Sequence, residues 1–507
     1  MLRTVQQTRL QVFRCPPLPS RRALHSSPPT LFRPSSRTLL FGLKLPEPSN
    51  EPLAGTIAEV GVSGPPWLFL LQLVVGLPAA LWAYKCLMLV LFQRKIIYLP
   101  SVPPGTRDES LAQGERSTAR DASLSGMRWK EVQIQSTVPS RWMRRPVKLK
   151  GIELEWKEDE GKAVEGQRQH VVVVYLQGNA GTPLLRAPLF RALLRPSPSR
   201  KATSPSRSAS SLPSSYHQSP PSPTPPPPPP PKVSLLALAP RSYWLSTRTT
   251  PTEAGVLADY RAALEYAYRI HGPEAKYVLY GHSLGGAAAV LLLEQLGQAP
   301  FPPLSSPAWS CAHPSPLSPP PHTTRPRVDA LIVENPLPSI PIMVRALYPQ
   351  KWLPYHYLGP FAFDKWDAAG RIERLSAWRG RGVGGEKRGG KGRGEEGGKG
   401  RKAVRTLWIR SGKDEIVPRG EEGEGGDPVR GMHADWLAAA TSSSDSAHTP
   451  HSDSSSVFSP VDTDDKLARW VTIPDALHDT AFLERKWREE VRGFLKEVAR
   501  EGRSGRG

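Results

Sequence analysis

A serine flanked by glycines lies at the junction of two apolar segments of this 507-residue chain. The run KYVLY before it has the length and the aromatic and β-branched composition of a buried strand, and GGAAAVLLLEQL after it is typical of a helix. Between them stand Gly281, His282, Ser283, Leu284 and Gly285, a G-x-S-x-G turn. The backbone turns too sharply there for side chains next to the serine. The sequence therefore predicts a strand, a tight turn and a helix, with the serine hydroxyl lifted above the edge of a sheet.

Apolar strand-like runs alternate with helical stretches on both sides of this turn. The predicted strands are His170–Leu176, Val233–Leu238, Tyr277–Tyr280, Val328–Val333, Val404–Ile409 and Trp470–Ile473. The predicted helices are Thr252–Tyr268, Leu284–Leu296 and Thr480–Arg500. Alternation of this kind predicts an α/β fold, with a mostly parallel central sheet covered by helices on both faces.

The folded domain predicted over residues 96–500 is interrupted by segments rich in proline, glycine and serine. The chain holds 57 prolines and 42 glycines, and they concentrate in stretches with too few apolar residues to offset the entropy of folding. These low-complexity inserts are expected at about 196–232, 297–326, 379–402 and 420–465. The run Pro225–Pro231 is a candidate for recognition by a polyproline-binding partner, with a solvated surface loop as the alternative.

Two segments precede the domain. Residues 1–40 are rich in arginine and serine and hold no acidic residue, which predicts either a mitochondrial targeting segment or a disordered basic tail. Residues 67–92 are long and apolar enough for a transmembrane helix, since a bilayer core needs about 20 mainly apolar residues. The alternative is a buried core helix. A single-pass membrane protein is predicted, with the mitochondrial and endomembrane locations left open.

The formal net charge of +21 raises the question of nucleic-acid binding. Many basic residues lie in the N-terminal tail and in the Gly/Arg/Lys tract at 379–402, and that tract has no interleaved Phe or Tyr to stack on bases. No nucleic-acid partner is therefore expected. The three cysteines, Cys15, Cys86 and Cys311, offer no zinc-ligand spacing, and neither a metal nor a cofactor is predicted.

A serine nucleophile requires a base, because its hydroxyl reacts poorly when neutral, and a carboxylate must hold that base in the right tautomer. His478 is the predicted base, in the loop between the last strand and the last helix. His282, His448 and His451 are poorer candidates, because the first belongs to the turn and the others to an insert.

The carboxylate is expected after the strand VRTLWIR, where Asp414 is followed by Glu415. Side chains at the carboxyl end of a parallel strand reach the crevice above the sheet. We predict that Asp414 is the orienting acid and Glu415 its rival.

An oxyanion hole needs backbone N–H groups that are already in place. Leu284, directly after the nucleophile, is predicted to supply one. The second is expected from Gln177-Gly178-Asn179-Ala180-Gly181, the loop after the strand VVVVYL, and Asn179 is the predicted donor.

These motifs occur in an order that resembles a known family. From Ile96 onward, outside the inserts, the chain resembles membrane-anchored α/β-hydrolase-domain proteins of the subfamily 13 and bud-emergence type. The matching pieces are FQRKIIYLP after the apolar segment, GNAG, YGHSLGG, ENPLPSIPIMVRALYPQKWLP, SGKDEIVP and LHDTAF. One departure is Gln177, which stands where relatives usually have histidine.

The resemblance implies the α/β-hydrolase fold and a single-pass membrane serine hydrolase that cleaves acyl esters or thioesters of lipids or acylated proteins. Two alternatives remain open at this point. A peptidase or amidase uses the same triad on the same fold, and a catalytically silent membrane scaffold keeps the fold without turnover.

Overall fold

The computed structural model describes eleven stretches of the chain. They are residues 65–107, 124–137, 146–157, 168–196, 230–298, 300–301, 326–382, 404–417, 419, 426–441 and 467–501. The N-terminal tail at 1–40, most of the inserts expected at 196–232, 297–326 and 379–402, including the proline run up to residue 229, and residues 420–425 and 442–466 lie outside the described residues.

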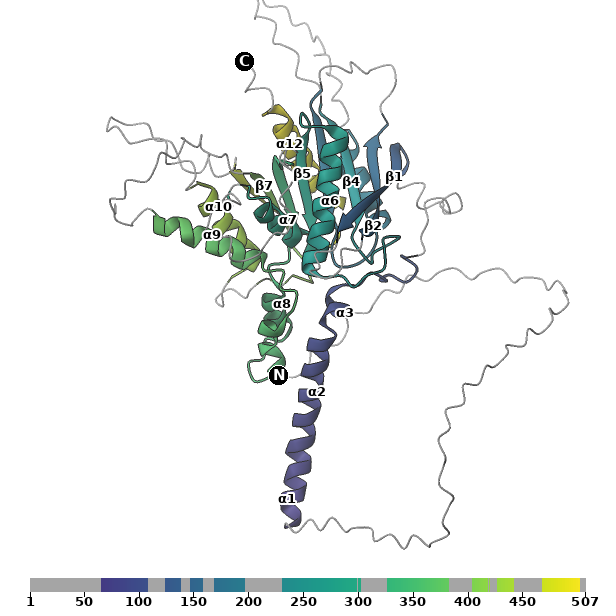
Figure 1. Ribbon diagram of the computed structural model, residues 1–507. Helices are drawn as coiled ribbons and strands as arrows, with labels where there is room; N and C mark the ends of the chain where they lie inside the picture. The colour runs from purple at the N-terminus through teal and green to yellow at the C-terminus, as the bar shows by residue number, and fades with distance from the viewer. Residues whose placement is uncertain are drawn as a thin grey trace, which may run out of the picture. The chain divides into compact units, whose positions relative to one another are not determined.

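One eight-stranded sheet forms the centre of the domain, in the order β1-β2-β4-β3-β5-β6-β7-β8 (Figure 1). The strands are β1 Met127–Thr137, β2 Pro146–Trp156, β3 His170–Leu176, β4 Lys232–Ala239, β5 Lys276–His282, β6 Ala330–Glu334, β7 Arg405–Ser411 and β8 Ala468–Ile473. Only β2 runs against its neighbours, and every other pair is parallel. A mostly parallel sheet with one reversed strand near its edge, crossed by helices after the parallel strands, is the α/β-hydrolase fold that the sequence predicts.

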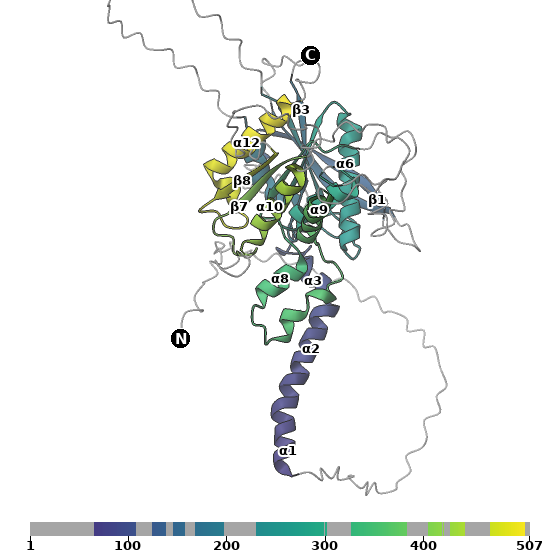
Figure 2. The same cartoon turned by 90° about the vertical axis from the view of Figure 1, so that its left-hand side faces the viewer.

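Helices cover both faces of this sheet. On one face lie α6 Glu253–His271, α7 Leu284–Gln295, α9 Ala368–Gly382 and α10 Pro428–Thr441, and on the other lie α5 Ala187–Leu194 and α12 Arg485–Arg500 (Figure 2). The central strands are buried on both sides, as the pattern of β3 shows, because helices exclude water from each face. In α12 the apolar residues recur at helical spacing, so one stripe, from Trp487 to Val498, is buried and the rest is charged.

All six predicted strands exist, with ends that shift by a few residues. The hairpin of β1 and β2 was not predicted. In β1 the buried residues Met127, Val132 and Ile134 are separated by Lys, Glu and Gln that face solvent. An edge strand with one wet face has no continuous apolar run, so it lacks the signal that marks the central strands.

The expectation of a loose insert over 420–465 is wrong for its middle part, where α10 forms. Its residues Val429, Met432, Trp436 and Ala440 are three or four positions apart and buried. This short helical pattern of apolar residues is difficult to recognise in the sequence, because the residues on both sides of it are rich in Gly, Ser and Asp. Similarly, α9 extends to Gly382, into the insert expected from residue 379.

A helical segment precedes the sheet domain. It runs through α1 Pro66–Leu71, a π-helical turn at Gln72–Gly76, and α2 Leu77–Leu91, and α3 Gln93–Ile97 follows. The stretch Trp67–Leu91 is long and apolar enough to cross a membrane by length and composition, and its most apolar window is not buried by the protein. A helix in the core of a domain would have at least one face buried by the protein. This helix does not, which argues against the alternative of a buried core helix.

Candidate active site

The predicted nucleophile turn joins β5 to α7 at the carboxyl edge of the sheet. Ser283 has φ +54° and ψ −119°, a conformation that non-glycine residues rarely adopt. Hydrogen bonds on both sides maintain it: Ser283 N–H donates to the Glu334 carbonyl at 3.0 Å, and the Leu337 N–H donates to the Ser283 carbonyl at 3.0 Å. The strained backbone is thus held by the chain that leaves β6.

The glycines on either side of the serine are required by close approach. A Cβ at Gly281 would lie 2.3 Å from the Gly285 carbonyl oxygen, and one at Gly285 would lie 2.0 Å from the Leu176 carbonyl oxygen. Both distances are far below van der Waals contact, so a side chain would push α7 away from the end of β3. The turn can therefore close only with glycine at these two positions.

The predicted acid and base meet beside this turn. His478 Nδ1 and Asp414 Oδ1 are 2.9 Å apart, and both side chains are buried. A carboxylate can only accept, so Nδ1 carries the proton and Nε2 is left as the acceptor. Among the described residues no hydrogen bond joins Ser283 to His478. The ring of His478 instead lies 4.9 Å from the ring of His282, the neighbour of the serine.

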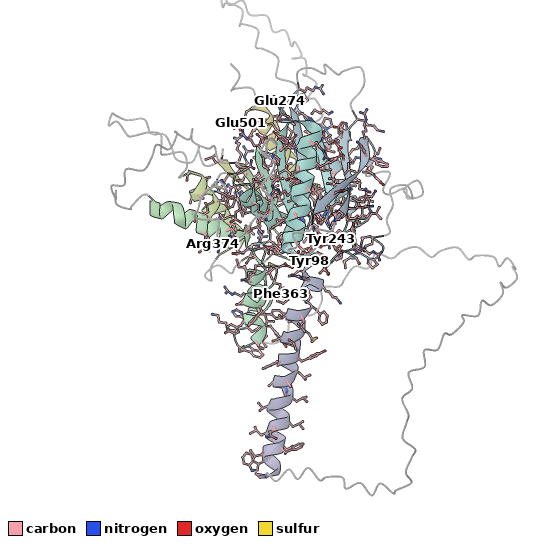
Figure 3. All side chains as sticks on the ribbon, viewed as in Figure 1. Tyr98, Tyr243, Glu274, Phe363, Arg374 and Glu501 are labelled. Carbon is pink, nitrogen blue, oxygen red and sulfur yellow. The ribbon has the colours of Figure 1, made fainter. Side chains whose placement is uncertain are left out.

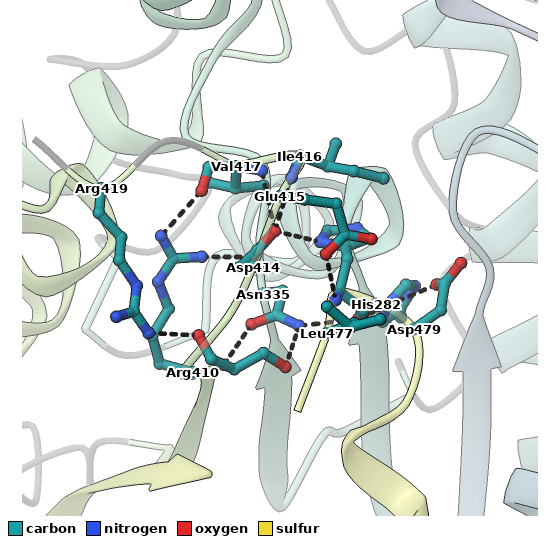
Figure 4. A network of polar contacts seen from close by, with 12 residues as sticks. His282, Asn335, Arg410, Asp414, Glu415, Ile416, Val417, Arg419, Leu477 and Asp479 are labelled. Atoms are coloured by element: carbon teal, nitrogen blue, oxygen red, sulfur yellow. Dashed lines mark hydrogen bonds and ion pairs between the residues drawn. The ribbon is translucent and has the colours of Figure 1, made fainter. Parts of the chain in front are cut away.

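Asp414 is fixed by donors from three directions (Figure 4). Its Oδ1 accepts from the N–H groups of Ile416 and Val417 at 2.9 and 3.0 Å, and its Oδ2 accepts from Arg410 Nη1 at 2.5 Å. Burial acts to raise the pKa of Asp414, but the hydrogen bonds and the charge of His478 hold it below its ordinary value. The carboxylate is therefore ionised when it faces the imidazole.

The rival carboxylate, Glu415, binds a different part of the histidine. Its Oε2 accepts from the backbone N–H of His478 at 3.0 Å. The structure thus places Asp414 against the imidazole and Glu415 against the main chain. Neighbouring residues around a turn point in different directions, so the two carboxylates hold the ring and the backbone separately.

Two residues of this site were not predicted. Asn335, just after β6, donates through Nδ2 to the His478 carbonyl and to Ser411 Oγ, both at 2.8 Å. Arg410, near the end of β7, is almost fully buried and also binds Asp427 and the Val417 carbonyl. The sequence feature that could have indicated both residues is their position. Each is a polar residue at the carboxyl end of a buried parallel strand.

A second polar cluster lies behind the imidazole. Arg186 Nη2 is 2.5 Å from Asp479 Oδ1 and 3.5 Å from His282 Nδ1, and His282 Nε2 is 3.0 Å from the His478 carbonyl. Burial, the cation of Arg186 and His478 together lower the pKa of His282 to about 3. His282 is therefore neutral, with Nε2 as the donor to His478.

This cluster also satisfies the spacing of a metal site, since ligand atoms of His282, His478 and Asp479 lie within 4.8 Å of one another. The guanidinium of Arg186 already neutralises Asp479, so a metal cation bound here would lie next to this positive charge. His478 Nδ1 is also bonded to Asp414. The donor set fits an ion-pair cluster and does not fit a metal ligand set.

The predicted oxyanion loop passes directly over the serine. A Cβ on Gly178 would lie 3.5 Å from the Ser283 Cβ, so the backbone here is in contact with the turn. The contacts of Asn179 are through its carbonyl, which accepts from Leu99 N–H and Tyr243 Oη at 2.8 Å each. Leu284 begins α7, and the first N–H groups of a helix have no intrahelical acceptor.

The chain that follows the apolar helix anchors this loop. Leu99 forms a parallel bridge with Ala180, and the Gly181 N–H donates to the Val102 carbonyl at 2.8 Å. Nothing in the sequence alone relates the apolar segment to the oxyanion loop. The structure joins them through only a few residues after α3.

A narrow recess lies beside the loop, and it is too tight to admit a water-sized sphere. Four of its nine lining residues are aromatic, namely Tyr98, Tyr243, Tyr260 and Trp366, and Leu284 lies next to them. Gln177 also lines the recess, and neither atom of its buried amide has a hydrogen-bond partner in the described part of the chain.

No family model matches the chain, and no curated protein matches its sequence. Solved structures with a similar course of chain include an alpha-beta hydrolase from Vibrio vulnificus, with 12% identity, a TM-score of 0.36, and coverage of 79% of this chain and 92% of that one. A bacterial heroin esterase has 12% identity and a TM-score of 0.37, with coverage of 82% and 96%. Carboxyl esterase 2 from Tuber melanosporum has 9% identity and a TM-score of 0.36, with coverage of 74% and 86%. The fold is assigned here from the strand order and the turn at Ser283.

The depressed pKa of His282 predicts a loss of stability in acid. The unfolded chain protonates this histidine near pH 6.5, whereas the folded protein does so only near pH 3. The unfolded state thus binds more protons between these values. The stabilisation that His282 contributes to the folded state is therefore complete above pH 6.5. Below pH 6.5 the free energy of unfolding decreases by about 1.4 kcal/mol for each pH unit.

The test is His282→Gln, which keeps a donor for the His478 carbonyl but does not titrate. Urea unfolding in detergent at pH 7, 6 and 5 should give a shallower decrease in unfolding free energy for the variant than for the wild type. Equal slopes would show that the folded and unfolded states protonate His282 alike over this range, and would contradict the prediction.

Proposed function

We propose that this protein is a serine hydrolase that cleaves acyl ester or thioester bonds through a covalent acyl-enzyme. Ser283 is the nucleophile, His478 the general base, and Asp414 the acid that orients the histidine. The observation that carries the proposal is the 2.9 Å hydrogen bond between a buried carboxylate and the imidazole, directly beside a serine in a strained strand-to-helix turn.

The chemistry follows from the protonation states at the site. His478 Nδ1 is committed to Asp414, so Nε2 is available to take the proton from Ser283 Oγ as the hydroxyl attacks the substrate carbonyl. The tetrahedral oxygen that forms carries negative charge, which we assign to the N–H groups of Leu284 and Asn179. His478 then protonates the leaving alcohol or thiol. Water activated by the same nitrogen releases the acyl group from Ser283.

Approach of Nε2 to the serine requires a small movement of the imidazole, because no hydrogen bond joins Ser283 and His478 among the described residues. Hydrogen bonds of this kind are often long before substrate binds. The backbone of His478 is held by Asn335, Glu415 and His282. Rotation of the ring about its side-chain bonds is thus the remaining freedom.

We propose that the apolar helix Trp67–Leu91 is a single membrane anchor. Such an anchor supports the proposal that the enzyme is of the membrane-anchored subfamily 13 and bud-emergence type that the sequence resembles. The anchor supports lipids or acylated proteins as substrates. Gln177 supports a substrate with a polar group near the scissile bond, since a buried amide without a partner costs about 1–3 kcal/mol. Aromatic walls beside it suit an acyl chain.

Replacing Ser283 with alanine should abolish labelling by a fluorophosphonate probe and hydrolysis of p-nitrophenyl esters. Circular dichroism should remain unchanged, because alanine is smaller than serine and keeps the backbone turn. A residual rate above ~1% of wild type would indicate another nucleophile. An unlabelled wild-type protein would favour the silent scaffold, and a preference for aminoacyl amides over esters and acyl thioesters would favour a peptidase.

The adjacent carboxylates provide a matched pair of variants. Asp414→Asn should lower kcat by at least ~10²-fold with little change in KM, because the amide no longer stabilises the imidazolium that forms in the transition state. Glu415→Gln still accepts from the His478 N–H through its carbonyl oxygen and should change kcat far less. Steady-state kinetics on a soluble ester gives both values, and the reverse order would make Glu415 the triad acid.

The anchor assignment predicts that the full chain resists extraction from membranes by alkaline carbonate. Changing both Leu73 and Val74 to Lys places two charges in the helix, each costing about 2.5–3.5 kcal/mol of insertion free energy, and should release the protein. Changing Ile270 and Leu483 to Lys, exposed residues outside the helix, should release none. Release of the wild-type chain by carbonate would contradict the anchor.

A further inference from the structure

The segment from Ile340 to Phe363, here called the cap segment, displays an unusual set of large exposed apolar side chains. It contains α8 Ile340–Leu347 and the short helices η5 Pro354–Tyr357 and η6 Gly359–Phe361. The exposed residues are Leu347, Trp352, Tyr357, Phe361 and Phe363, and the exposed fraction of Trp352 reaches 70%. Several such side chains gathered on one segment mark a surface that binds an apolar partner.

The cap segment packs against the C-terminal half of the apolar helix. The rings of Trp352 and Trp82 are 6.0 Å apart, and the ammonium of Lys85 lies 4.7 Å from the centre of the Tyr355 ring. Figures 1 and 2 both show α8 beside the end of α2 and α3. The exposed aromatic surface is therefore continuous with the exposed apolar surface of the helix.

Hydrogen bonds fix this arrangement at the end of the helix. Gln93 is buried and bonds both ways, with Nε2 donating to the Phe361 carbonyl at 3.2 Å and Oε1 accepting from the Phe363 N–H at 2.7 Å. Arg94 forms an ion pair with Asp364 at 3.0 Å. Phe363, labelled in Figure 3 near Tyr98, is thus tied to the residues where the apolar helix ends.

The length of the helix decides where the cap segment must lie if the helix spans a bilayer. From Trp67 to Trp82 the helix rises about 22 Å. A hydrocarbon core is about 30 Å thick, so this part alone cannot cross it. Gly64 and Pro65 precede the helix and Pro66 is its first residue, so the apolar span cannot be extended in this direction. The level of Trp82, and with it Trp352, therefore lies within the membrane or at its boundary.

The charge of the cap segment fits the same partner. Its sequence, IPIMVRALYPQKWLPYHYLGPFAF, contains no acidic residue, and its basic side chains Arg345 and Lys351 are exposed. Tyr and Trp are favoured at the level of the lipid headgroups, where basic side chains also meet phosphate. A protein partner would not require this combination next to an exposed apolar helix.

The cap segment also adjoins the active site. The backbone N–H of its first residue, Ile340, donates to the Lys365 carbonyl. Trp366, which follows Lys365 in the chain, lines the recess together with Tyr98. The indole N–H of Trp366 donates to Tyr98 Oη at 3.0 Å. The chain just after the cap segment thus lines the recess beside Leu284, and a backbone hydrogen bond ties this chain to the start of the segment.

We propose that the cap segment is seated in the headgroup and outer acyl region of the bilayer, so that the recess beside Ser283 receives acylated lipid directly from the membrane. The proposal rests on the membrane insertion of the apolar helix and adds to it a second, monotopic contact.

The test measures membrane depth at single positions of the full chain in liposomes. In a background with Cys15, Cys86 and Cys311 changed to Ser, an environment-sensitive nitrobenzoxadiazole label is placed by Leu347→Cys or Phe361→Cys. A label at Val74→Cys, in the apolar helix, is the membrane control. A label at Ile270→Cys, an exposed apolar residue at the end of α6, is the water control. Each sample is then titrated with doxyl-labelled phospholipid.

The expected result is blue-shifted emission and quenching by doxyl lipid at residues 347 and 361, approaching those at residue 74, with neither at residue 270. Quenching at 74 without quenching at 347 and 361 overturns the proposal and leaves the anchor intact. Blue-shifted but unquenched emission at 347 and 361 indicates a protein partner and also overturns it. No quenching at 74 removes the anchor itself, and the proposal with it.

Discussion

The close approach of three strand ends at Ser283 is the constraint on which the rest of the site depends. Gly285 lies against the carbonyl of Leu176 at the end of β3, and the Ser283 N–H binds the carbonyl of Glu334 at the end of β6. The serine can hold its strained conformation only because β3, β5 and β6 are adjacent in the sheet. The same adjacency brings the loop after β3 over the serine and the loop after β7 beside it.

Around this turn, the acid and the base are each fixed by more than one contact. Asp414 is ionised and buried, a condition that would be unfavourable without Arg410 and two backbone N–H groups. The main chain of His478 is bound by Asn335, Glu415 and His282, so its backbone cannot drift when the ring turns. The ring and the main chain of His478 are therefore held by separate groups, the ring by Asp414 and the main chain by the other three residues.

The chain that follows the apolar helix and α3 is bound directly to the loop after β3. The chain leaves α3 at Ile97 and within two residues donates from Leu99 to the Asn179 carbonyl. Tyr243 binds the same carbonyl from the loop after β4. Tyr98, which directly follows α3, is also one of the residues that line the recess beside Leu284.

The sequence by itself determined the turn at Ser283, the six buried strands and the order of serine, acid and histidine, because these depend on local backbone requirements and on continuous apolar runs. It predicted Asp414, with Glu415 as its rival, for the carboxylate that faces the imidazole, but it did not indicate Arg410, Asn335 or the β1–β2 hairpin. Those features depend on how distant segments align across the sheet, and an edge strand with one wet face carries little apolar signal. The contact of Trp352 with Trp82 joins residues 270 positions apart. Only the tertiary structure could decide it, because nothing in either segment alone specifies which surface the other will meet.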